Sequence, residues 1–288
     1  CSYYYYFFHY PKISLFKNMM LEEKIEAIPV LNNKGQVVEL LRWREVFSCE
    51  FKPNASLQSV PVLVMAGGKG VRMDPFTRIL PKPLIPLGDK PIIEIIMDRF
   101  ACYGCKRFYV TVNYKGKMIQ SYFDNAECGY AIKYVWEDKP CGTAGGIKLV
   151  GDALDAPHLF VSNCDVLIKA DYADIHKFHI ENDNDITIVG SMKHFLIPYG
   201  VLEMNNGGIL KNIDEKPEYD LLVNTGMYII KKANVHHIPS DTKFDFTELI
   251  LNIKNSGGKI GVYPIGQHSW IDVGQWHEYH GALEKWVK

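Results

Sequence analysis

The sequence predicts an α/β protein built mainly on a doubly wound sheet, mixed but mostly parallel. From Val60 onward, short apolar segments of strand character alternate with segments of helical periodicity, the pattern of a parallel sheet with helices on both faces. The chain has 288 residues, of which 47% are hydrophobic, enough for a sizeable core. We therefore assign residues 60–288 to one three-layer α/β/α domain and residues 1–55 to a small appendage with its linker.

The elements of the main domain are expected to alternate along the chain. Apolar runs predict strands at residues 62–66, 108–113, 131–135, 159–162, 187–192, 200–204 and 223–230. Apolar residues at helical spacing predict helices at 91–103, 118–123 and 246–256. The strands at 187–192 and 200–204 are expected to complete the centre of the sheet.

The appendage is expected to contain a helix and a hairpin. A helix is predicted over 14–25, followed by strands at 27–31 and 36–41 joined by the turn Asn32-Asn33-Lys34-Gly35. A short helix from Trp43 and a linker over 51–59 follow. One such unit has too little core to stand alone, so it should pack on the main domain, on a second copy in a homo-oligomer, or on further sequence.

Composition narrows the class of protein. A net charge of −1 and a pI of about 6.9 give no sign of a nucleic-acid partner. No apolar stretch has the length of a membrane span, and the N-terminal residues lack the features of a signal peptide. Seven cysteines without a regular framework favour free thiols and a cytoplasmic location. Cys102 and Cys105 are read as a helix end with Gly104 as the stop, rather than as half of a zinc site.

A glycine-rich turn follows the first strand of the main domain. Gly67-Gly68-Lys69-Gly70 lacks three Cβ atoms, so its backbone N–H groups can approach an anion closely. Arg72 then offers a fork of donors for phosphate oxygens, and Pro81-Lys82-Pro83 holds a lysine on a stiff stretch. The spacing fits neither the Rossmann nor the Walker motif. By itself the glycine-rich segment is equally consistent with a tight surface turn and with a phosphate-binding loop. Together with Arg72 and Lys82 it predicts a nucleoside triphosphate site.

The longer pattern resembles that of the sugar-1-phosphate nucleotidyltransferases. It reads Gly67-Gly68-x-Gly70-x-Arg72-x-x-Pro75-x-Thr77, followed by Pro81-Lys82-Pro83-Leu84-x-Pro86. The resemblance implies a Rossmann-like, GT-A-like nucleotidyltransferase fold and the transfer of a nucleotidyl group to a sugar 1-phosphate. Val71 departs from the family, which usually carries Thr or Ser there. The residues implied to contact the nucleotide are Ala66, Gly67, Gly68, Gly70, Asn113, Gly142 and Thr143.

Two aspartates are candidate ligands of Mg²⁺. Asp165 follows the apolar run Leu159-Phe160-Val161, and the carboxyl ends of strands are where α/β sheets bind ligands. Mg²⁺ commonly takes one or two carboxylates plus substrate phosphates. Alone, Asp165 reads as a turn cap before a helix, and Asp272 as the N-cap of a helix over 276–286. The family resemblance, including the Trp270-x-Asp272-x-Gly274 segment, implies that both are metal ligands instead.

A second set of residues is implied to hold the sugar phosphate. It consists of Gly200, of Glu215 and Lys216 in the segment Glu215-Lys216-Pro217, and of Asn224 in the segment Asn224-Thr225-Gly226. Without the resemblance, Lys216 reads as an exposed turn lysine. No nucleophile–base pair stands out, and none is needed, because a sugar phosphate is largely dianionic at neutral pH and can attack the α-phosphorus itself. Arg72 would stabilise the departing pyrophosphate, Lys82 the reacting phosphates, and Lys216 the incoming phosphate.

Within the family, the chain looks most like CBS-linked guanylyltransferases that act on glucosamine 1-phosphate for nonulosonate (legionaminate) pathways. The catalytic likeness covers residues 60–288, and the appendage resembles one repeat of a CBS domain, a module that normally occurs in pairs. GTP is therefore the expected nucleotide, with UTP, CTP or dTTP as alternatives. A non-catalytic nucleotide-sugar sensor is an alternative of another class. For the appendage, ligand binding and simple docking stay open.

Overall fold

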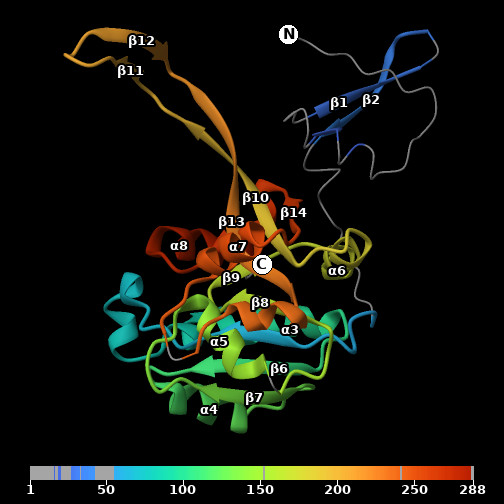
Figure 1. The fold of residues 1–288 in the computed structure, drawn as a ribbon, viewed down its shortest axis with the longest axis vertical. Coiled ribbons are helices and arrows are strands. Elements are labelled where there is room, and N and C mark those ends of the chain that lie inside the picture. Colours follow the sequence, from blue (N-terminus) through green and yellow to red (C-terminus); the bar gives the residue numbers. More distant parts are fainter. Residues whose placement is uncertain are drawn as a thin grey trace. The chain divides into compact units, whose positions relative to one another are not determined.

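The computed structural model describes residues 16, 19–20, 27–32, 34–42, 55–151, 153–240 and 242–286. The chain forms two compact units (Figure 1). The first unit takes its described residues from 1–48, 190–223 and 264–269. The second unit takes its described residues from 49–189, 224–263 and 270–288. Within the described residues, no helix is both long enough and apolar enough to cross a lipid bilayer.

A seven-stranded sheet organises the chain, in the order β14-β10-β13-β8-β3-β6-β7. Its strands are β3 (Val62–Met65), β6 (Arg107–Val112), β7 (Ala131–Trp136), β8 (His158–Asn163), β10 (Ile186–Leu196), β13 (Glu218–Lys231) and β14 (Ile260–Ile265). The pairs β3–β6, β3–β8 and β6–β7 are parallel, whereas β13 runs antiparallel to β8. The predicted mixed, mostly parallel sheet is confirmed.

Two different cores cover the two faces of this sheet. The helices are α3 (Ile92–Cys102), α4 (Gly116–Asp124), α5 (Gly142–Gly151), α6 (Tyr172–Glu181), α7 (Phe246–Asn255) and α8 (Trp276–Trp286). Leu63 of β3 belongs to a buried cluster with Ile147 of α5 and Leu249 of α7. On the other face, the ring of Phe100 in α3 contacts Phe160 of β8 at 5.3 Å. Helices therefore cover both faces, as a doubly wound sheet requires.

One predicted strand belongs elsewhere. Gly200–Met204 does form a strand, β11, but it pairs only with β12 (Leu210–Glu215) in a separate two-stranded sheet. The prediction that it completes the centre of the main sheet is wrong. The physical reason is that, among the described residues, no second layer covers this strand: Leu202 and Met204 are 60% and 71% exposed, which does not suit a strand buried on both faces.

The described part of the appendage confirms the predicted hairpin. β1 (Ala27–Leu31) and β2 (Val37–Arg42) pair antiparallel, and Asn32 Oδ1 accepts hydrogen bonds from the backbone N–H groups of Lys34 and Gln36 at 2.9 and 3.0 Å. Ile28 forms a small buried cluster with Phe16 and Met20, against which Met192 of β10 packs. The helix expected over 14–25 lies mostly outside the described residues, as do the helix from Trp43 and the start of the linker.

Shorter elements complete the second unit. Its short strands are β4 (Pro86–Leu87), β5 (Lys90–Pro91), β9 (Val166–Ile168) and β15 (Trp270–Asp272). Helix α3 ends at Cys102 with Gly104 as the stop, because the backbone N–H of Gly104 returns to Ala101 O at 2.8 Å, as predicted. Of this pair, Cys102 is exposed and Cys105 is buried.

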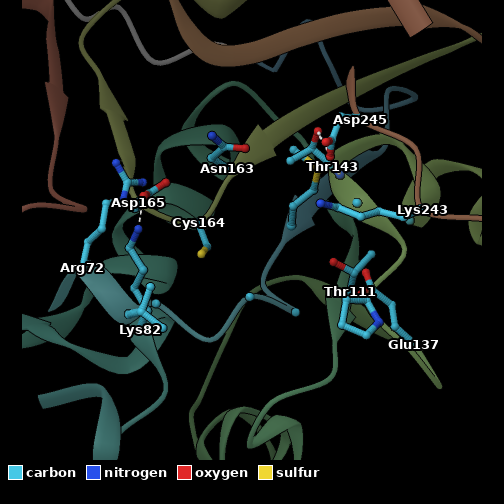
Figure 2. Close-up of a pocket in the computed structure, with 18 residues that line it drawn as sticks. Arg72, Lys82, Thr111, Glu137, Thr143, Asn163, Cys164, Asp165, Lys243 and Asp245 are labelled. Atoms are coloured by element: carbon cyan, nitrogen blue, oxygen red, sulfur yellow. Dashed lines mark hydrogen bonds and ion pairs between the residues drawn. The ribbon is translucent and has the colours of Figure 1, made fainter. Parts of the chain in front are cut away.

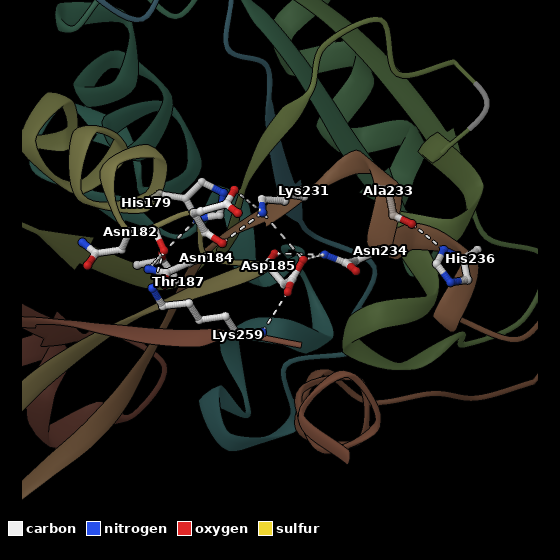
Figure 3. Close-up of polar contacts among 11 residues, drawn as sticks. His179, Asn182, Asn184, Asp185, Thr187, Lys231, Ala233, Asn234, His236 and Lys259 are labelled. Carbon is white, nitrogen blue, oxygen red and sulfur yellow. Dashed lines mark hydrogen bonds and ion pairs between the residues drawn. The ribbon is translucent and has the colours of Figure 1, made fainter. Parts of the chain in front are cut away.

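A polar network fixes the end of the sheet where β10 begins (Figure 3). The Asp185 carboxylate accepts hydrogen bonds from Asn234 Nδ2 at 3.0 Å and from the backbone N–H of Lys259 at 2.8 Å. Beside it, the buried Thr187 hydroxyl bonds to Asn184 Nδ2 at 3.1 Å and to His179 Nδ1 at 2.8 Å. The two Asp185 bonds join segments far apart in the chain, so the network is structural.

Three histidines between α6 and β8 make folding sensitive to acid. The rings of His158 and His176 are 5.5 Å apart, and those of His158 and His179 are 4.9 Å apart. Burial, aided by the neighbouring histidines, lowers the pKa of His176 to about 4 and that of His179 to about 3. The unfolded chain, with histidine pKa values near 6.5, therefore binds more protons below pH 6.5.

We expect stability to be complete above pH 6.5 and to fall as the pH drops from 6.5 towards 4. Replacing His176 by Phe keeps a ring but removes one titrating group, so the fall in Tm between pH 7 and pH 5 should shrink by a few degrees. Thermal melts at both pH values measure this. His277→Phe, at an exposed histidine of α8, is the control and should leave the pH dependence unchanged. An undiminished fall in His176→Phe would contradict the assignment.

Candidate active site

The glycine-rich turn lies at the carboxyl end of β3 and carries the first candidate residues. Gly70 has φ 66, and a Cβ there would lie 2.8 Å from Lys82 Cβ and 3.0 Å from Thr77 Cγ2. Only glycine therefore fits both the left-handed backbone and the approach of the Lys82 side chain. The turn lines a cavity that also contains Arg72, Lys82 and Asp165, which excludes the plain surface-turn interpretation.

Lys82 and Asp165 form a buried ion pair. Lys82 begins the short helical turn η3 (Lys82–Leu84), and its ammonium contacts Asp165 Oδ2. The two side chains are only 10% and 9% exposed. Buried charges of this kind persist only when they are paired or bind a ligand. The pair therefore marks a site with a chemical purpose more than a source of stability.

The pairing of β9 with β15 brings the second aspartate to the same place. Asp272 lies opposite Val166 in this antiparallel pair, and the backbone N–H of Val273 donates to Asp165 O at 2.9 Å. A Cβ on Gly274 would lie 2.6 Å from Lys82 Nζ, 2.8 Å from Asp272 Oδ1 and closer still to Asp165 Oδ2. The two carboxylates and the ammonium thus surround one point that only a glycine leaves free.

Neither aspartate caps a helix. Strand β9 follows Asp165, and Asp272 ends β15, whereas α8 begins only at Trp276. The helix-cap alternatives are therefore wrong. Among the described residues, no group of three or more His, Cys, Asp or Glu side chains could hold a metal ion by itself. Two carboxylates at a phosphate loop do fit a Mg²⁺ whose other ligands are phosphate oxygens and water.

The cavity has two chemically different ends (Figure 2). Arg72, Lys82 and Asp165 lie at one end, and Thr111, Glu137, Thr143, Lys243 and Asp245 lie at the other. The Thr143 backbone N–H donates to Asp245 Oδ1 at 3.1 Å, and its hydroxyl accepts from the Phe246 N–H at 2.8 Å. These bonds tie the start of α5, with Gly142 and Thr143, to the start of α7. The side chains at one end of the cavity therefore suit phosphates, and those at the other end suit a nucleobase.

Two predicted nucleotide contacts, Ala66 and Asn113, are not among the residues that line the cavity. The Ala66 N–H donates to Thr111 O at 3.1 Å, which ties the end of β3 to β6. Asn113 Nδ2 donates to the backbone oxygen of Glu137 at 2.5 Å. Both residues shape the lining, whereas Gly67, Gly68 and Gly70 belong to it directly.

Glu137 is a cavity residue that the sequence analysis missed. A Cβ on Gly67 would lie 2.8 Å from its Oε2, so the carboxylate lies against the glycine turn. Burial raises the pKa of Glu137, opposed by hydrogen bonds from the Cys141 backbone and the Thr111 hydroxyl. The signal was present in the sequence, since Glu137 lies two residues after the strand predicted at 131–135, near the strand end where ligands of such sheets bind.

The predicted sugar-phosphate residues fall in both units. Asn224 lies in the second unit and lines a cavity with Arg72, Asp165 and Asp272, and its Nδ2 donates to Tyr228 Oη at 2.8 Å. Gly200 and Glu215 lie in the first unit, opposite each other in the β11–β12 pair. Lys216 follows with φ 49 and an exposed side chain. The structure thus brings Asn224 to the carboxylates and groups the other three with one another.

A family model described as Nucleotidyl transferase matches residues 61–288. The chain belongs to the nucleotidyl transferase family. It is 29% identical over 250 residues to the UTP–glucose-1-phosphate uridylyltransferase of Synechocystis, covering 78% of this chain and 64% of that protein. It is 28% identical to the mannose-1-phosphate guanylyltransferase of Mycobacterium tuberculosis, covering 80% and 63%. The chain thus spans less than two thirds of the length of these two relatives.

Shorter relatives of this nucleotidyl transferase are covered almost completely. The D-glycero-α-D-manno-heptose 1-phosphate guanylyltransferase of Campylobacter jejuni is 27% identical, over 77% of this chain and 97% of that protein. Among solved structures, HddC from Yersinia pseudotuberculosis superimposes with a TM-score of 0.63 at 26% identity, covering 78% of this chain and 99% of that one. HddC has also been crystallised with GMP-PN. The prediction of a nucleotidyltransferase with the α/β fold of that family is confirmed.

Proposed function

We propose that this chain is a sugar-1-phosphate nucleotidyltransferase, which joins a nucleoside triphosphate to a sugar 1-phosphate and releases pyrophosphate. The observation that carries the proposal is the meeting of Asp165, Asp272 and Lys82 around Gly274, beside a glycine-rich phosphate turn. The named relatives transfer guanylyl or uridylyl groups to sugar 1-phosphates, which supports the same reaction class here.

The reaction needs alignment and charge neutralisation more than a protein nucleophile. An oxygen of the sugar phosphate bonds to the α-phosphorus, and the bond from that phosphorus to the bridging oxygen of the β-phosphate breaks. Arg72, exposed at the cavity, is suited to the departing pyrophosphate because its guanidinium binds phosphate oxygens in pairs. Asn224 lines a cavity with Arg72, Asp165 and Asp272, which supports its assignment to the incoming sugar phosphate.

We assign Mg²⁺ to Asp165 and Asp272, and Lys82 to the reacting phosphates. Bound Mg²⁺ would neutralise charge on the phosphates and on the leaving group. The ion pair with Asp165 holds the Lys82 ammonium in the site before substrates arrive. With the carboxylates engaged in this way, the Lys82 ammonium would donate hydrogen bonds to oxygens of the reacting phosphates.

Glu137 supports GTP as the nucleotide. A carboxylate offers two acceptor oxygens, and guanine presents two adjacent donors, N1–H and the N2 amino group. Uracil and thymine present a single N–H, and cytosine and adenine place a ring acceptor beside their amino group. A carboxylate at the end of the cavity opposite the metal site therefore favours guanine.

Turnover of a panel of nucleotides tests this choice. With matched sugar phosphates, GTP should give the highest kcat/KM among GTP, UTP, CTP, dTTP and ATP. Glu137→Gln should lower kcat/KM for GTP by about tenfold to a hundredfold, because the amide turns a donor towards a guanine donor. The control is Asp138→Asn, at the exposed neighbouring position. Faster turnover of wild-type protein with another nucleotide would overturn the choice of GTP.

The proposals for the sugar substrate and for the origin of the appendage rest on sequence resemblance. We propose glucosamine 1-phosphate as the sugar substrate, held by Gly200, Glu215, Lys216 and Asn224, and a CBS-like origin for residues 1–55. The strand–turn–strand order of the β1–β2 hairpin supports the CBS-like origin.

A further inference from the structure

The segment that joins Arg72 to Lys82 has little regular structure of its own. It consists of the short helical turns η1 (Val71–Met73) and η2 (Phe76–Arg78), followed by η3. Turns this short leave most of their carbonyl groups without partners in the segment. The two cations assigned to the phosphates therefore depend on neighbouring elements to hold their backbone in place.

Lys115 binds the carbonyl groups at the end of η2. Its Nζ donates to Arg78 O at 2.5 Å, to Ile79 O at 2.8 Å and more weakly to Thr77 O at 3.4 Å. The adjacent Tyr114 hydroxyl donates to Thr77 O at 3.1 Å. An ammonium has three donors and no acceptor, so it matches three carbonyl oxygens at a helix end, where positive charge is also favoured.

Thr77 links these bonds to Lys82. Its side chain is 4% exposed, and its methyl group lies at the point where Lys82 Cβ also approaches Gly70. The Thr77 backbone is thus held by Tyr114 and Lys115, and its methyl group and the base of the Lys82 side chain both lie beside Gly70. A shift of the Thr77 carbonyl would therefore reach Lys82 through the packing around Gly70.

Helix α8 holds the two flanks of the same segment independently. Trp276 Nε1 donates to Asp74 O at 3.2 Å, and the Tyr279 hydroxyl donates to Pro86 O at 2.6 Å. The segment is therefore fixed at both flanks without Lys115. Loss of the ammonium should loosen the middle of the segment rather than unfold it.

We propose that Lys115 is a positioning residue for nucleotidyl transfer, which holds the 77–79 carbonyls so that Lys82 stays aligned with the phosphates. This inference rests on the proposed function. Lys115 lines neither the cavity of Arg72 and Glu137 nor that of Asn224, so it acts through the segment and not on the substrate.

Three variants test the proposal by steady-state kinetics. Lys115→Met keeps the length of the side chain but removes its donors, and should lower kcat by about tenfold to a hundredfold, the cost of small misplacements in active sites. KM for the nucleotide should change much less, and Tm should stay close to wild type. Lys115→Arg should restore most of kcat. Lys117→Met, at an exposed lysine of helix α4, which begins directly after Lys115, should match wild type. Wild-type kcat in Lys115→Met would overturn the proposal.

Amide hydrogen exchange provides a readout that does not depend on turnover. In Lys115→Met the amides of Arg78, Ile79 and Leu80 should exchange faster than in wild type, and unchanged exchange would overturn the proposal. Hydrogen exchange tests the role of Lys115 even if the protein turns over no pair of substrates. Absence of turnover would refute the proposed function but not the role of Lys115 in holding the segment. If Lys115→Met does not fold, Tyr114→Phe removes one bond to Thr77 O and should lower kcat a few-fold. An unchanged kcat in that variant would overturn the proposal.

Discussion

Replacing Asp165 by Asn should nearly abolish turnover. The carboxylate faces Lys82 and Asp272 around Gly274, and under the proposed function its charge would help to hold Mg²⁺. Loss of a metal contribution of about 4 kcal/mol corresponds to roughly a thousandfold lower kcat. Because Asn has nearly the same volume, the fold should survive. Removing one partner of a buried ion pair costs about 3–5 kcal/mol, so Tm should fall as well.

Rates at saturating Mg²⁺ and nucleotide, with circular dichroism and thermal melts, measure both effects. Asp171→Asn is a matched control, because Asp171 only caps α6 by accepting from the N–H groups of Ala173 and Asp174. Asn caps helices about as well as Asp, so this control should keep both kcat and Tm. A wild-type rate for Asp165→Asn at saturating Mg²⁺ would refute the metal assignment.

The Lys82→Ala variant should lose about a hundredfold to a thousandfold in kcat/KM. Removing one preorganised donor to developing negative charge typically has this effect. The substitution also leaves the Asp165 carboxylate, 9% exposed, without its cation, which should lower Tm. Arg72→Ala should lower kcat/KM without a comparable loss of Tm, because its side chain is exposed.

The double variant makes this test sharper. Since Lys82 and Asp165 are in contact, their effects should not add, and the Asp165→Asn, Lys82→Ala protein should be little worse than the poorer single variant. Losses that multiply in full would show that the two side chains act independently. A near-wild-type kcat/KM for Lys82→Ala would remove Lys82 from the phosphate site altogether.

Local sequence patterns were sufficient for some of the strands, such as β3, and for the phosphate turn. The run Val62–Met65 is apolar throughout, as a strand buried on both faces must be. The glycines of the turn that follows favour the binding of an anion by backbone N–H groups. The hairpin at Asn32–Gly35 was predicted because its turn residues determine the conformation of the turn. For these elements, each residue's own properties decide the structure.

Contacts between distant segments were beyond sequence reasoning alone. Periodicity gives no register between β9 and β15, which are about a hundred residues apart, and only the family resemblance brought Asp272 to Asp165. The roles of Glu137 and Lys115 likewise depend on neighbours from other elements. Strand β11 was misplaced because strand character alone does not say which sheet a strand joins.

The products of the wild-type reaction test the central claim most directly. With Mg²⁺, GTP and a panel of sugar 1-phosphates that includes glucosamine 1-phosphate, phosphorus NMR should show pyrophosphate and a sugar-linked diphosphate appearing in equal amounts. Neither should appear when the sugar phosphate is omitted. Release of pyrophosphate or phosphate from GTP without a sugar phosphate, or binding of both substrates without any product across the panel of nucleotides, would contradict the account.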